Sequence, residues 1–145
     1  MIVDAYVTRP EVGGGNLDLV NSTYKIEGED GIRFGQRTWR RNMVSSPFVH
    51  GEFPVTQTMG NSQVECNIQI RAASMSALNT AIASLVAAFS QFEYAFYVTL
   101  DDVTWGWTCF AADIAVESSD ERMAQFNTVA RLSIPRLPIP ISGGI

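Results

Sequence analysis

The sequence predicts a mainly β domain with one α-helix, arranged as an antiparallel β-sandwich or partly closed barrel that the helix flanks. Two changes of hydrophobic period support this prediction. From Gln63 to Arg71 polar and apolar residues alternate, as in a strand with one buried face. The apolar period then lengthens to that of a helix between Ala73 and Gln91, and it returns to two from Phe92. The order strand, helix, strand is the framework of the prediction.

Residues 1–16 end in a glycine triplet and are expected to form an N-terminal arm outside the core. A single β domain is expected over 17–134. The remaining residues, 135–145, are expected to form an extended tail, since each proline fixes its own backbone angle and lacks an amide donor. The length of 145 residues suits one domain with a proper core.

Three short strands are predicted before the long alternating strand, over Thr23–Glu27, Ile32–Phe34 and 36–43. The third carries the only basic cluster of the sequence, which consists of Arg37, Arg40 and Arg41 around Trp39. Such a cluster meets an anion or an acidic partner surface, or it forms a solvated strand face. The solvated face is the more common role.

Between Val44 and Gly60 the sequence loses its period, and prolines and glycines interrupt it, so a long loop is expected. Its apolar residues need a cover, which either a partner subunit or the core of the domain provides. The single histidine, His50, lies in this segment beside Gly51. A lone histidine in such a context is more often structural than catalytic.

The predicted helix has an apolar stripe and no charged residue. The stripe consists of Met75, Leu78, Ile82, Leu85 and Phe89, and Ser74 or Ser76 stands where an N-cap is expected. The opposite side has only short polar residues and alanines, whereas an exposed helix usually carries charges there. Its polar interruptions argue against a membrane span. We therefore expect this side to face a neighbouring subunit, or to be an alanine-rich solvent face.

After the helix, Phe92–Leu100 and Val103–Val116 are predicted to form a hairpin that turns at Asp101-Asp102. Trp105 and Trp107 lie on one face of the second strand. They are expected to pack in a core or an interface, although two such side chains can also form a platform for a sugar. The last predicted strand is Met123–Ile134. Its inward-facing residues are expected to be Phe126, Thr128, Ala130, Leu132 and Ile134.

Composition and motifs favour a structural role. Charged residues make up 17% of the chain, below the roughly 25% typical of soluble domains, which suggests burial in an assembly. The net charge of -5 argues against binding nucleic acid through phosphates. Cys66 and Cys109 lie in predicted strands and are expected to be buried free thiols. No residue pattern indicates a catalytic, cofactor or metal site, so the sequence does not predict an enzyme.

Several segments, taken together in order and spacing, resemble a known family. They are the strand Arg37–Arg41 followed by Ser46-Pro47-Phe48-Val49-His50-Gly51, the strand Val64–Arg71, the helix Met75–Phe89, the aromatic hairpin Phe92–Ala112 and the closing segment Leu132–Pro138. This arrangement resembles the tail-tube and distal tail hub proteins of long-tailed bacteriophages. The resemblance implies two antiparallel sheets packed against one helix. It covers most of the chain and is closer to the minor tail proteins near the distal end of the tube.

The resemblance also implies a function. The chain would be a structural virion protein that is assembled in the host cytoplasm and located in the phage tail. It would form a ring of six or three copies around the tail channel, in contact with neighbouring tail tube and tail tip proteins. DNA would be only passing cargo, no cofactor would be needed and no membrane would be entered. The expected subunit interface consists of Phe48, Val49, Phe53, Val55, Leu137 and Ile139.

Other functions compete with this one. Within the same assembly, the chain could be the major tail tube protein or the tail terminator. From another class, it could be a carbohydrate-binding β-sandwich whose platform is Trp105 and Trp107.

Overall fold

We describe a computed structural model of the chain, which gives residues 2–27, 32–35, 38–46, 49–117 and 125–142. Over most of 38–58 the description is limited to the backbone. In chain order the elements are β1 (Ile2–Val7), β2 (Leu17–Asp18), β3 (Tyr24–Ile26), β4 (Ile32–Arg33), β5 (Thr38–Ser46), β6 (Val49–Gly60), β7 (Ser62–Arg71), α1 (Met75–Phe89), β8 (Glu93–Leu100), β9 (Val103–Phe110), β10 (Asp113–Val116) and β11 (Asn127–Arg136).

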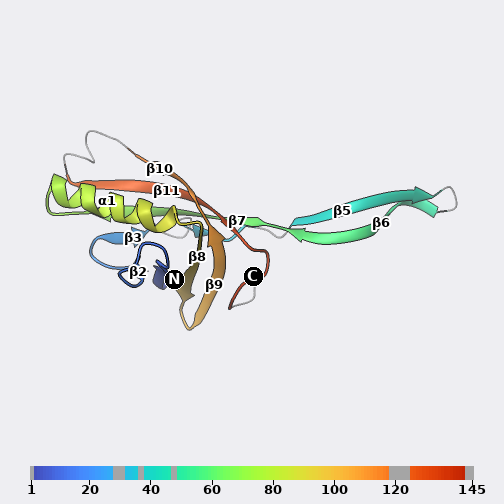
Figure 1. Cartoon of the computed structure of the whole chain (residues 1–145), viewed down its shortest axis with the longest axis horizontal. Coiled ribbons are helices and arrows are strands. Elements are labelled where there is room, and N and C mark those ends of the chain that lie inside the picture. The colour runs from blue at the N-terminus through green and yellow to red at the C-terminus, as the bar shows by residue number, and fades with distance from the viewer. Residues whose placement is uncertain (1, 28–31, 36–37, 47–48, 118–124, 143–145) are drawn as a thin grey trace.

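Nine of the described strands form one sheet, in the order β2-β1-β8-β9-β11-β7-β3, with β10 beside β11 and β4 beside β7. Each of these pairings is antiparallel. The sheet curves until it is nearly closed into a barrel, and α1 lies along β7 and β11 (Figure 1). The predicted fold class, mainly β with a single helix, is confirmed for the described residues.

The core lies between α1 and the inner face of the sheet. Strand β7 turns Val64, Cys66, Ile68 and Ile70 inward, as its alternation predicts. From the helix, the buried side chains are Leu78, Ala81, Leu85, Ala88 and Phe89. Met75 is the exception to the predicted stripe, because it is 47% exposed in the first turn. The N-cap is Ser74, whose side chain accepts a hydrogen bond from the amide of Ala77.

The N-terminal segment belongs to the sheet, so the expectation that residues 1–16 lie outside the core is wrong for β1. This strand pairs with β8 and buries Ala5 and Val7. The glycines at 13, 14 and 15 all have positive φ, a conformation that favours glycine. They make the turn after which β2 pairs back onto β1. The triplet is therefore part of an ordered connection between two strands.

The segment 103–116 is two strands, where the sequence suggested one. It divides at Ala111 and Ala112, because the amide of Ala112 donates to the carbonyl of Phe89 and the chain then crosses from β8 to β11. Strand β11 begins at Asn127, so Phe126 lies before it, with a φ of 56° and its side chain partly exposed. The other four inward residues predicted for this strand are buried.

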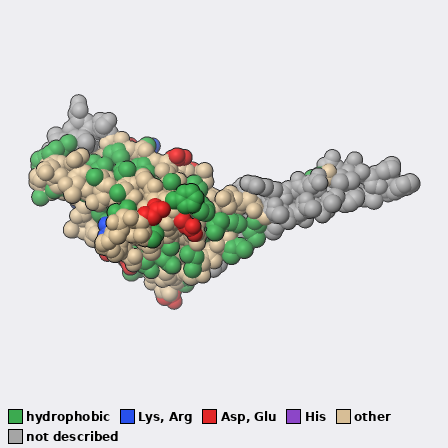
Figure 2. All heavy atoms as spheres, in the orientation of Figure 1, with side chains coloured by type: hydrophobic (Ala, Val, Ile, Leu, Met, Phe, Trp, Pro, Cys, Tyr) green, Lys and Arg blue, Asp and Glu red, His purple; other side chains and the backbone are tan. Residues whose placement is uncertain are grey.

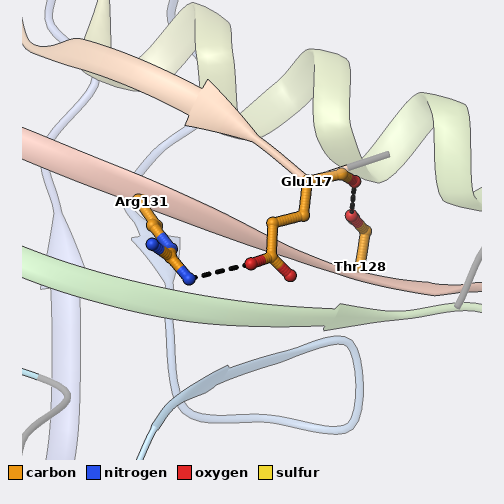
Figure 3. A network of polar contacts seen from close by, with 3 residues as sticks. All are labelled: Glu117, Thr128 and Arg131. Atoms are coloured by element: carbon orange, nitrogen blue, oxygen red, sulfur yellow. Dashed lines mark hydrogen bonds and ion pairs between the residues drawn. The ribbon is translucent and has the colours of Figure 1, made fainter. Parts of the chain in front are cut away.

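A polar network fastens β10 to β11 (Figure 3). The side chain of Arg131 donates to Glu117 at 2.8 Å, and the hydroxyl of Thr128 donates to the carbonyl of Glu117. Arg131 is 64% exposed, so the ion pair is a surface contact of modest energy. Its geometric effect is to hold the two strands together on either side of their connection.

The largest difference from the sequence prediction is at 44–60, where the described residues belong to strands and not to a loop. Strands β5 and β6 form a long hairpin that extends away from the rest of the molecule (Figure 1). Its register shifts twice, between Asn42 and Met43 and between Ser45 and Ser46. Each shift interrupts the alternation of side chains. The strand period therefore cannot be read from this part of the sequence.

Candidate assembly interface

The hairpin of β5 and β6, residues 38–60, is hereafter the arm. In the described part of the chain its two strands pair only with each other. Each strand therefore has one edge whose amides and carbonyls are open to a further strand. A two-stranded hairpin is only marginally stable in water without packing against something else. The arm thus has the properties of a segment that a partner covers.

The composition of the arm agrees with this interpretation. Along the backbone Trp39 is opposite Met59, and Val44 is opposite Phe53. The arm contains two arginines and one glutamate, a formal charge of +1, while the whole chain carries -5 and the remainder therefore -6. The arm thus combines a positive charge with several large apolar residues, and it is joined to the acidic remainder of the chain, hereafter the body. This distribution suits contact between unlike surfaces of two copies.

The structure separates the predicted interface residues into two groups. Val49, Phe53 and Val55 lie on β6, where only their backbone is described, and Phe48 lies outside the described residues. Leu137 and Ile139 follow β11 on the body, at 38% and 66% exposure. Figure 1 shows that β5 and β6 reach away from the part of the molecule that contains β11. The described candidates therefore lie on two different parts of the chain, β6 and the segment after β11.

The tail after β11 is fixed on its own domain. The amide of Leu137 donates to the carbonyl of Thr108, and that of Ile141 donates to the carbonyl of Gly106. The amide of Gly106 donates in turn to the carbonyl of Ser142. The tail therefore continues the sheet along β9. Its apolar side chains Leu137, Ile139 and Ile141 remain partly exposed.

The tryptophans do not form a platform, contrary to the carbohydrate-binding alternative. Trp107 is fully buried, and the guanidinium carbon of Arg136 lies 5.5 Å from the centre of its ring. Trp105 packs edge-on against Phe34, with ring centres 4.7 Å apart. Arg136 also donates to the carbonyls of Phe34 and Leu137. Both indoles are part of the core and its margin, which confirms the expected packing role.

A shallow groove of about 380 Å³ lies on the outer face of β7, β10 and β11. It is lined by Glu65, Asn67, Asp113, Ile114, Ala115, Arg131, Leu132 and Ser133.

Within the described residues no three histidine, cysteine or carboxylate side chains are grouped so that they could hold a metal ion. In the same residues no helix has the length and apolarity needed to cross a membrane.

The two cysteines are free and buried, as predicted. Burial raises the pKa of the Cys66 thiol to about 12, and the nearby Cys109 adds to this effect. The pKa of Cys109 is also raised to about 12 by burial, although the guanidinium of Arg136 opposes the shift. Both groups are therefore protonated thiols near neutral pH, which makes them poor nucleophiles.

One exposed residue was not singled out in the sequence. Phe92 lies between α1 and β8 and is 76% exposed, although its place in an alternating segment suggested the first residue of a strand. Its amide donates to the carboxylate of Glu11 at 2.8 Å. Strand β8 begins at Glu93, so Phe92 precedes it and does not follow the alternation of the strand.

Comparison with known proteins identifies the fold. No protein-family model matches the chain, and no curated protein sequence is similar to it. A chain of the phage p2 baseplate, in its activated conformation with Sr, superposes with a TM-score of 0.68 at 9% identity. The match covers 92% of this chain and 44% of that one. The same baseplate with Ca gives a TM-score of 0.68 at 10% identity.

A second phage structure gives the same result. The SPP1 Dit protein, described as a paradigm of the hub adsorption apparatus in phages that infect Gram-positive bacteria, superposes with a TM-score of 0.60 at 10% identity. The match covers 96% of this chain and 52% of that one, so this chain spans about half the length of its structural neighbours. The fold is that of phage baseplate and hub proteins. The resemblance inferred from the sequence is confirmed at this level.

Proposed function

We propose that the chain is a structural protein of a phage tail, located at the distal end of the tail tube, and that its copies form a closed ring through the arm. The likeness of fold to the phage p2 baseplate chain and to SPP1 Dit supports the class of protein. The observation that carries the ring is the arm itself. It is an apolar hairpin with two open edges, and it extends beyond the body of its own copy.

The energetics of the arm favour association. Burying a large apolar side chain contributes about 1.5 to 3 kcal/mol as an upper estimate, from which the cost of ordering the segment is subtracted. Several such residues lie between Phe48 and Val55, and they recur in every copy. An arm that contacts a different surface of the next copy makes a head-to-tail interface, which closes into a ring when the rotation permits.

The finer features of the proposal follow the family resemblance. The ring holds six or three copies and surrounds a channel through which DNA passes as cargo. Its neighbours are tail tube and tail tip proteins, and it is assembled in the host cytoplasm. In this role the chain catalyses no reaction. A position as major tube protein or terminator remains a second candidate within the same assembly.

The double variant Phe48→Ser with Phe53→Ser tests the role of the arm. We expect a folded subunit that assembles poorly, because the arm loses two large apolar side chains while the body keeps its core. Sedimentation velocity measures the assembly, and circular dichroism measures the fold. Phe126→Ser is the matched control, since it removes a partly exposed phenylalanine from the body.

Two outcomes would contradict this use of the arm. If the double variant unfolds, residues 48–53 belong to the core of their own domain. If it assembles as the wild type does, the interface lies elsewhere, and the uncharged outer side of α1 becomes the next candidate.

A further inference from the structure

Phe92 is the most exposed of the large hydrophobic side chains in the described residues, at 76%. Val12, next to Glu11 in the chain, is 52% exposed. Solvated aromatic side chains in monomers are usually isolated and need no explanation. Phe92 differs from such residues, because its backbone is held by hydrogen bonds and acidic residues lie next to it. This combination indicates a contact surface.

The backbone beneath Phe92 is firmly held. Gln91 is only 3% exposed, and its side-chain amide donates to the carbonyls of Thr8 and Ala88 while its oxygen accepts from the amide of Glu11. These bonds join the end of α1 to the segment after β1. The carboxylate of Glu11 completes the connection by accepting from the amide of Phe92. The ring is therefore attached to a preorganised support, which lowers the entropy lost on binding.

Two acidic residues lie next to Phe92, Glu11 through its hydrogen bond to the amide and Glu93 in the chain. Glu11 and Glu93 are both exposed, and Glu93 follows Phe92 directly in the chain. Figure 2 shows hydrophobic side chains beside acidic ones on the face of the body that is turned to the viewer. Two guanidinium donors of Arg9 bind the carbonyls of Gly14 and Gly15. An exposed aromatic ring with acidic residues beside it suits a guanidinium group, which combines a cation–π contact with charged hydrogen bonds.

We propose, on the basis of the function proposed above, that Phe92, Glu11 and Glu93 form the surface that receives the arm of a neighbouring copy. The segment that docks there is the part of β5 that carries Arg40 and Arg41. Charge complementarity selects this occupant, because the arm carries +1 and the remainder of the chain -6. Donor and acceptor surfaces differ, so each copy uses both, as a head-to-tail ring requires.

A complementation experiment on the full chain tests this assignment. The acceptor variant is Phe92→Ser with Glu93→Gln, and the arm variant is Arg40→Glu with Arg41→Glu, so that the two variants do not restore a charge-swapped pair. We expect each alone to associate at least about tenfold more weakly than the wild type. The acceptor variant loses apolar contact and charge pairing, and the arm variant loses charge pairing. Mixed at equal concentration, they retain one intact interface per pair. They should therefore form a dimer that grows no further, as measured by sedimentation velocity.

Control variants separate this inference from general effects of charge and folding. Asp113→Lys reverses an exposed charge on β10 and should assemble as the wild type does. If the acceptor variant does not fold, Glu93→Gln alone replaces it, and the same weakening, now smaller and dependent on salt, is expected. Near-ultraviolet circular dichroism establishes the fold of each variant.

The possible results distinguish this inference from the function on which it depends. An acceptor variant that assembles as the wild type does overturns the inference and leaves the ring intact. Folded variants that stay monomeric when mixed also overturn it, since the two surfaces then do not complement each other. A wild-type chain that is itself monomeric contradicts the proposed function, and this inference with it.

Discussion

At the scale of single residues, two buried tyrosines differ in whether their hydroxyl group forms a hydrogen bond. The hydroxyl of Tyr24 donates to the carbonyl of Ala81 at 2.7 Å. The hydroxyl of Tyr94 has no partner among the described residues, although it is buried beside Phe89. Burial raises the pKa of Tyr94 above its usual range, which keeps the group protonated. An unpaired buried hydroxyl lowers stability, whereas a paired one contributes to it.

We therefore expect Tyr94→Phe to leave the free energy of unfolding unchanged or to raise it by up to about 1 kcal/mol. The matched variant Tyr24→Phe should lower it by about 1 kcal/mol, because the carbonyl of Ala81 loses its donor. Urea unfolding followed by circular dichroism measures both. Equal destabilisation by the two substitutions would contradict the assignment of Tyr94 as unpaired.

The sequence predicts which side chains are buried where the hydrophobic period is regular. It does not predict burial or exposure that depends on contacts with residues distant in the sequence. The inward residues of β7 follow from alternation alone. The exposure of Phe92 does not, because Phe92 precedes β8 and its amide binds the carboxylate of Glu11, which is 81 residues away in the sequence. The burial of Arg136 also depends on distant residues, since its guanidinium binds the carbonyl of Phe34 and lies over Trp107. Such contacts are set by tertiary structure and leave no periodic signal.

At the scale of elements, α1 is the most predictable part of the chain. Its bounds of Met75 and Phe89 lie within the predicted range, because an apolar stripe and a serine cap agree on where it begins. The sequence left two candidates for that cap. The structure selects Ser74, whose side-chain oxygen lies 3.2 Å from the amide nitrogen of Ala77.

Replacing the cap should weaken the domain. We expect Ser74→Ala to lower the free energy of unfolding by about 0.5 to 2 kcal/mol, since one amide at the start of α1 loses its acceptor. Ser76→Ala is the control, because Ser76 lies inside the first turn and alanine favours a helix. A loss of stability at Ser76 with none at Ser74 would contradict the observed cap. Thermal or urea unfolding provides the measurement.

The sequence predicted the first part of β5, as the strand 36–43, but it did not predict the rest of the arm or β1. In the arm, two register shifts break the alternation, and prolines and glycines add to the appearance of a loop. In β1, a short strand is followed by three glycines, so its two buried residues are too few to establish a period. Both became strands because a partner strand supplies their hydrogen bonds. The residues proposed for the interface were recognised by their apolar character alone.

At the scale of the whole molecule, the shape and the distribution of charge agree on head-to-tail association. The sheet of the body is nearly closed into a barrel and encloses its own core. The arm extends from the body, and among the described residues no third strand pairs with it (Figure 1). Because the strands of the arm pair only with each other among the described residues, their outer edges are open to a partner. The opposite charges of arm and body favour contact between different surfaces of successive copies.

The mass of the purified wild-type chain in solution, measured by multi-angle light scattering over a range of concentrations, tests the central claim of ring assembly most directly. A closed ring predicts a discrete species of three or six times the monomer mass, with no larger series, because a closed interface leaves no free arm. A chain that remains monomeric at the highest concentration would contradict the claim, and so would a continuous distribution of open polymers.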